Sequence, residues 1–126
     1  MRRLSGLVLL MMLVAGLGAP LEAAEDFCIR DNFNRIFELK LAAVLVFGQL
    51  IAVPFNAPTI GTMVPNREVP GQDIMKLRFF DPVVTTAWAC EGTGNRDSRN
   101  FNGTCRAGFQ TLPWFVFPFF PCPTPF

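Results

Sequence analysis

Residues 74–79 read Ile-Met-Lys-Leu-Arg-Phe, and residues 84–90 read Val-Thr-Thr-Ala-Trp-Ala-Cys. In the first stretch apolar and basic residues alternate, and in the second every other residue from Val84 to Cys90 falls on one face. A period of two is typical of a strand with one buried face. The pair Asp81-Pro82 between the stretches is typical of a turn. The sequence therefore predicts two consecutive strands here.

The pattern continues on both sides of this pair of strands. Residues 91–100 are polar and rich in glycine and asparagine, which predicts a loop, and residues 104–109 are expected to return from it as a strand. Prolines and glycines interrupt residues 54–71 and exclude a long helix there. Short strands at roughly even spacing predict a mainly β domain, a small disulfide-stabilised sandwich or barrel-like fold.

Residues 32–47 fit two structures. The run Phe37-Glu38-Leu39-Lys40-Leu41 alternates as a half-buried strand does. Apolar residues from Phe33 to Leu45 also recur at helical spacing, with Asp31 or Asn32 as a cap and Gly48 as a stop. The β-forming residues at 44–47 and 50–53 favour strands. An α+β fold with one helix near 32–47 is the alternative.

Four cysteines, Cys28, Cys90, Cys105 and Cys122, follow the N-terminal segment. An even number in a small exported domain predicts two disulfides, for which three pairings exist. Cys90 and Cys105 flank the expected loop, so we predict that they pair, which leaves Cys28 with Cys122. A zinc site is disfavoured because the chain has no histidine and no closely spaced cysteine pair.

The first 23 residues have the layout of a secretory signal peptide. Arg2 and Arg3 precede an apolar run that begins at Leu7, and Ala23 is the expected cleavage point. Residues 24–126 would then form a single small exported domain, secreted or periplasmic, with residues 24–32 as a polar lead-in. This domain has equal numbers of acidic and basic residues, so no nucleic-acid partner is expected. The apolar run at 39–55 is too interrupted to span a membrane.

The C-terminal tail, residues 112–126, reads LPWFVFPFFPCPTPF. It either covers the open end of the core, pinned by Cys122, or presents an aromatic patch to a protein partner or a membrane interface. Its prolines allow one short strand at 114–117 and extended backbone after that. The residues of the candidate interaction patch are Trp114, Phe115, Phe117, Phe119 and Phe120.

The residue types restrict the chemistry that is open to this chain. With no histidine, no Ser-His or Cys-His pair exists, and nothing in the sequence pairs two carboxylates. We therefore expect no enzyme, no catalytic or metal-binding residue and no cofactor. Asn102-Gly103-Thr104 fits the N-glycosylation acceptor pattern, or a turn. The sequence favours an exported, non-enzymatic binding or structural module with an unknown protein or surface partner. The alternative is a membrane-active or host-directed factor that acts through its tail.

Overall fold

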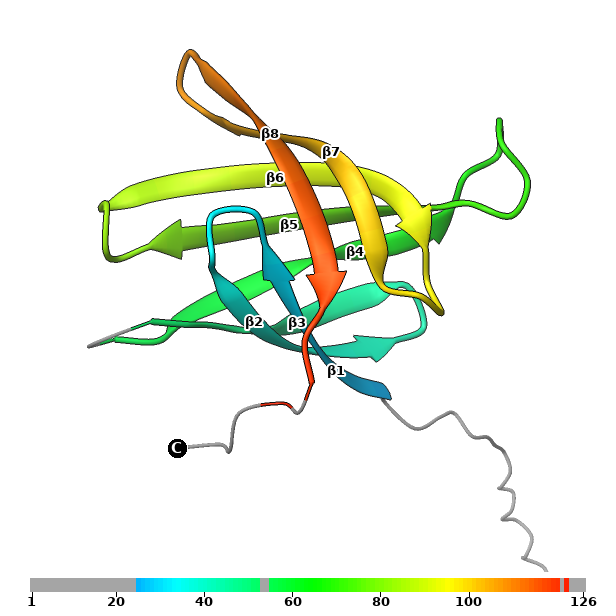
Figure 1. Cartoon of the computed structure of the whole chain (residues 1–126), viewed down its shortest axis with the longest axis horizontal. Helices are drawn as coiled ribbons and strands as arrows, with labels where there is room; N and C mark the ends of the chain where they lie inside the picture. Colours follow the sequence, from blue (N-terminus) through cyan, green and yellow to red (C-terminus); the bar gives the residue numbers. More distant parts are fainter. Residues whose placement is uncertain (1–24, 53–54, 121, 123–126) are drawn as a thin grey trace, which may run out of the picture.

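The structure is a computed structural model and describes residues 25–52, 55–120 and 122. These residues form eight antiparallel strands, each paired with the next along the chain, and the last pairs with the first to close a barrel (Figure 1). The strands are β1 (Glu25–Asp31), β2 (Ile36–Ala42), β3 (Leu45–Ile51), β4 (Ala57–Pro65), β5 (Asp73–Asp81), β6 (Thr86–Asn95), β7 (Asn100–Ala107) and β8 (Gln110–Pro118). The predicted mainly β, barrel-like and disulfide-stabilised fold is thus confirmed.

Two expectations for the N-terminal half are wrong. The alternative of a helix near 32–47 fails because β2 and β3 pair residue for residue, from Ile36 with Ile51 to Ala42 with Leu45. The polar lead-in is strand β1, which pairs with β2 and β8. The charged residues of this segment suggest a solvated loop, but Asp26 and Arg30 lie on the outer face of the strand. Phe27 and Ile29 are buried in the core. The signal-peptide prediction lies outside the described residues.

The barrel interior is filled by side chains at alternate positions of every strand. In β5, Met75, Leu77 and Phe79 are buried while Lys76 and Arg78 are exposed, as the alternation predicts. Eight strands enclose a space just wide enough for side chains or for one small ligand. Trp114 of β8 is among the largest side chains that are fully buried in this core.

The polar loop expected at 91–100 is much shorter than predicted. Strand β6 continues to Asn95 and β7 begins at Asn100, so only residues 96–99 form the turn. Glycines misled the prediction, because here they let neighbouring strands approach closely. A Cβ at Gly94 would lie 1.8 Å from the Asn100 carbonyl oxygen. Asn102-Gly103 likewise lies inside β7, whose strand ends at Ala107, so it is not a turn.

Two disulfides link the structure. Cys90 and Cys105 are directly paired across β6 and β7 and bond in the core. Cys28 of β1 bonds to Cys122 beyond β8. The chain after β8 runs beside β1, since the amide of Phe119 donates to the carbonyl of Cys28 at 2.9 Å. These are the two pairings ranked first from the sequence.

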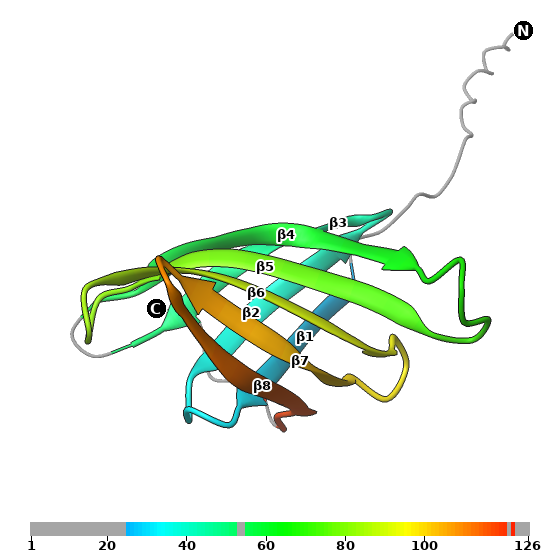
Figure 2. The same ribbon diagram turned by 90° about the horizontal axis from the view of Figure 1, so that it is seen from above.

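The two ends of the barrel are built differently. The turns after β1, β3, β5 and β7 lie at one end, which faces left in Figures 1 and 2, and we call this end the mouth. The turns after β2, β4 and β6 lie at the opposite, far end. Among the described residues, no helix is long and apolar enough to cross a membrane.

Candidate ligand-binding site at the barrel mouth

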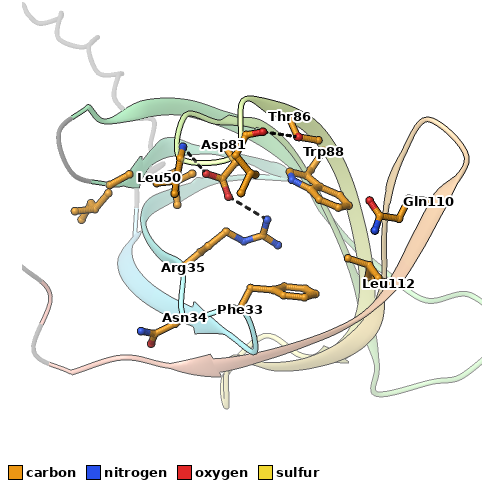
Figure 3. A pocket seen from close by; sticks show the side chains of 13 residues that line it. Phe33, Asn34, Arg35, Leu50, Asp81, Thr86, Trp88, Gln110 and Leu112 are labelled. Atoms are coloured by element: carbon orange, nitrogen blue, oxygen red, sulfur yellow. Dashed lines mark hydrogen bonds and ion pairs between the residues drawn. The ribbon is translucent and has the colours of Figure 1, made fainter.

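A pocket of about 600 Å³ opens between the turns of the mouth (Figure 3). Its size is within the range of pockets that hold small organic ligands. Apolar side chains form most of its wall, with a few polar groups among them. The lining residues are Phe33, Asn34, Arg35, Leu50, Ile51, Ala52, Asp81, Val83, Val84, Thr86, Trp88, Gln110 and Leu112.

Asp31 organises the turn on which the pocket floor is built. Its Oδ1 accepts hydrogen bonds from the amides of Phe33 and Arg35, both at 3.0 Å. Asn34 takes a left-handed conformation with φ of 63°, which asparagine tolerates. The other oxygen, Oδ2, accepts from Arg35 Nε at 2.8 Å and from Trp114 Nε1 at 3.0 Å. One buried carboxylate therefore fixes the turn, the arginine and the core tryptophan together.

The Arg35 guanidinium lies among aromatic rings beneath the pocket. Its central carbon is 4.8 Å from the ring centre of Phe33, 4.9 Å from that of Phe79 and 5.5 Å from that of Trp88. Such stacking suits a planar cation. Its Nη1 lies 3.5 Å from Asp81 Oδ2 (Figure 3), while its Nε is paired with Asp31. A cation held by two carboxylates forms a rigid polar floor.

Trp88 carries a hydrogen-bond donor without an acceptor. The residue is 8% exposed, and its Nε1 is buried with no hydrogen-bond partner among the described residues. Figure 3 shows the nitrogen edge of the indole turned toward the side chains of Asp81 and Arg35. A buried donor left unpaired costs about 1–3 kcal/mol. An acceptor atom on a bound molecule would remove that cost, provided that the side chains around the buried nitrogen shift to admit it.

The sequence pattern does not predict this site. Trp88 was predicted only as a strand residue and Asp81 only as part of a turn, while Asp31 and Arg35 were given no binding role. A signal was present, since an aspartate four residues before an arginine, with asparagines between, suits a tight turn closed by an ion pair. The partner residues on β5 and β6 are distant in sequence, so the pattern alone does not bring them together.

The candidate tail patch does not form one surface. Trp114 is buried in the core, whereas Phe115 and Phe117 are exposed on the outer side of β8. Phe119 is half-buried beneath the Arg30 guanidinium, and Phe120 is exposed beyond it. Asn102, the candidate glycosylation residue, is exposed on β7. None of these residues lines the mouth pocket.

The scan against protein-family models finds no match, and the searches of curated proteins and of solved structures find none either. The barrel and the chemistry of its pocket are therefore the observations that bear on function. That chemistry combines an apolar wall, a guanidinium fixed by two carboxylates and, among the described residues, an unpaired indole N–H donor. A pocket with an apolar wall and a few fixed polar groups is the usual form of a small-molecule site in proteins.

Proposed function

We propose that this chain is an exported, non-enzymatic binding module that holds one small, neutral, mostly apolar molecule in the barrel mouth. The single observation that carries this proposal is the buried, unpaired Trp88 N–H at the pocket wall. Native proteins pair nearly all buried polar groups, so an exception at a pocket points to a ligand acceptor. The bound molecule would therefore carry a carbonyl or ether oxygen.

The charges at the pocket favour a neutral ligand. Asp31 and Asp81 carry two negative charges against the single positive charge of Arg35. An anionic ligand would add a third negative charge in a poorly solvated space, which is unfavourable. An ammonium ligand would offer only donors, and the indole N–H would stay unpaired. A neutral ligand with an acceptor oxygen adds no charge to the pocket and can also pair with the indole N–H.

Export is part of the same proposal. It is supported by the signal-like residues 1–23 and by two disulfides, which are compatible with an oxidising compartment. A barrel whose core is cross-linked at Cys90–Cys105 offers a stable frame for a pocket outside the cell.

The probe for a test is Prodan, a neutral naphthalene with one carbonyl acceptor and polarity-sensitive fluorescence. We expect saturable binding to one site per chain. Leu112→Trp fills the pocket and should abolish it, whereas Leu45→Trp adds the same indole to the exposed far-end wall and should not. Absence of saturable binding in the unmodified protein would refute the proposed function.

A second variant tests the acceptor. Trp88→Phe keeps an aromatic wall but removes the N–H, so Prodan affinity should fall about tenfold, the effect of one hydrogen bond of about 1–1.5 kcal/mol. The emission of the bound dye should also shift to the blue, because its carbonyl has lost a donor. Unchanged affinity and emission would remove the acceptor assignment while leaving the binding site in place.

A further inference from the structure

All four turns at the mouth present exposed apolar side chains. We call these five residues the mouth rim: Phe33, Phe55, Val83, Val84 and Phe109. Phe109, at the tip of the β7–β8 hairpin, is fully exposed, and Figure 1 shows this hairpin projecting beyond the rest of the barrel. The far-end turns at 66–72 and 96–99 are mostly polar by contrast. The far-end turn after β2 exposes Val44 and the adjacent Leu45, each less than half exposed. The most exposed apolar residues of the turns, Phe55, Val83 and Phe109, therefore lie at the mouth.

Three exposed arginines lie on the outer wall of the barrel, about three residues along their strands from the mouth turns. Arg30 and Arg106 each precede a rim phenylalanine by three residues, and Arg78 lies three residues before the end of β5. All three are exposed. At about 3.3 Å per strand residue, three residues set a cation about 10 Å behind an apolar tip.

Exposed carboxylates lie farther from the mouth. Glu25, Asp26, Glu68 and Asp97 are at the far end, and Glu91 lies midway along β6. The nearest carboxylate on the outer wall is the half-buried Glu38, which accepts a hydrogen bond from Gln49 at 3.2 Å. The wall behind the rim is therefore net positive.

We infer that the mouth rim docks on the surface of an anionic lipid bilayer. Apolar groups of interfacial proteins enter about 5–10 Å below the headgroups, which matches tips that stand about 10 Å ahead of arginines at phosphate level. The tips belong to separate turns around a hollow, an arrangement that a fluid lipid surface can fill. A docked barrel would open its pocket toward the phase in which apolar molecules are concentrated. This inference goes beyond ligand binding and does not depend on it.

The test is partition of the disulfide-bonded protein onto vesicles of phosphatidylcholine alone and of phosphatidylcholine with phosphatidylglycerol. We expect binding to the anionic vesicles and at least tenfold weaker binding by the double variant Phe55→Ser/Phe109→Ser. Phe47→Ser, on the outer wall of β3, is the matched control and should bind normally. Each of Arg30→Gln, Arg78→Gln and Arg106→Gln should weaken binding about fivefold.

A reporter variant places the contact. Phe109→Trp should show a blue-shifted emission on anionic vesicles that brominated lipid quenches, with unchanged thermal melting. Failure to bind either vesicle would overturn the inference, and a protein partner for the rim would then be the explanation. Loss of binding by Phe120→Ser with normal binding by the Phe55/Phe109 variant would overturn it in favour of the tail. Equal binding to both vesicles would overturn the role of the arginines.

Discussion

Each end of the barrel contains a largely buried arginine packed on at least one aromatic ring, yet the two arginines are held differently. At the mouth, Arg35 lies between Asp31 and Asp81 and is stacked on three rings. At the far end, Arg99 pairs with Glu25 and lies 4.0 Å from the ring centre of Phe27. Its Nη1 is buried without a hydrogen-bond partner among the described residues.

The partners of the two arginines explain the difference between the ends. The Asp31 side chain is fully buried, whereas that of Glu25 is 55% exposed. A buried carboxylate with four hydrogen bonds fixes its arginine, and an exposed one is screened by water. Arg99 thus covers the core at the far end, while Arg35 is a fixed floor over which a pocket opens. The following predictions test this contrast.

The largest loss of stability is expected from a truncation that removes β8, which runs between the two ends of the barrel. A chain ending at Thr111 loses Trp114 and Val116 from the core, opens the barrel between β7 and β1, and loses Cys122. A missing buried tryptophan costs about 3–5 kcal/mol and a missing disulfide about 2–5 kcal/mol. Together these approach the whole stability of a small domain. The shortened chain should not fold.

Circular dichroism and thermal melting provide the measurement for this truncation. A chain ending at Cys122 is the matched control, because it keeps β8 and the Cys28–Cys122 disulfide. A cooperative transition at the unmodified melting temperature in the chain ending at Thr111 would show that β8 is dispensable.

The next prediction compares the carboxylates of the two ends. Asp31→Ala leaves the Arg35 charge, the Trp114 N–H and two turn amides without their acceptor, so the free energy of unfolding should fall by about 3–5 kcal/mol. Glu25→Ala removes a half-exposed partner and should cost about 1 kcal/mol or less. Urea unfolding of both variants measures the difference. Equal losses would mean that the two arginines are held alike.

The sequence reveals the strands better than the site, and the reason is physical. Alternation is local, so Met75, Leu77 and Phe79 predict an inward face without knowledge of neighbouring strands. The disulfide pairing can also be predicted from the sequence, because Cys90 and Cys105 are only 15 residues apart and the other pair then follows by elimination. By contrast, the sequence predicts a loop at Gly94, because the close backbone approach that requires glycine there arises only once β7 places Asn100 beside it.

The pocket required contacts between distant segments. Asp31 and Arg35 share the turn after β1, but Asp81 lies at the end of β5, and in the sequence each of these charges is typical of a solvated side chain. Only the closure of β1 against β8 brings Trp114 to Asp31, across 83 residues of chain. Neither the alternation nor the composition contains that information. The mouth rim is not apparent in the sequence either, because it is made of one or two apolar residues from each of four turns that are far apart along the chain.

The smallest effect is expected from the charge of the ligand. It tests whether Asp31 and Asp81 at the mouth outweigh the positive charge of Arg35. Methyl 1-naphthoate and 1-naphthoate share a ring system and a carbonyl oxygen, but at pH 7 the acid carries a negative charge. In the mouth that charge would approach Asp81, whose Oδ2 is already 3.5 Å from the only guanidinium among the lining residues. We expect the ester to displace Prodan about tenfold more strongly than the acid, a difference of about 1.4 kcal/mol.

Two matched variants test the cause of this preference for the ester. Asp81→Asn removes one negative charge at the mouth and should reduce the preference. Glu25→Gln removes one negative charge at the far end and should leave the preference unchanged. Preference for the acid in the unmodified protein would show that Arg35 recognises anions, in which case the two carboxylates do not neutralise it as the geometry implies.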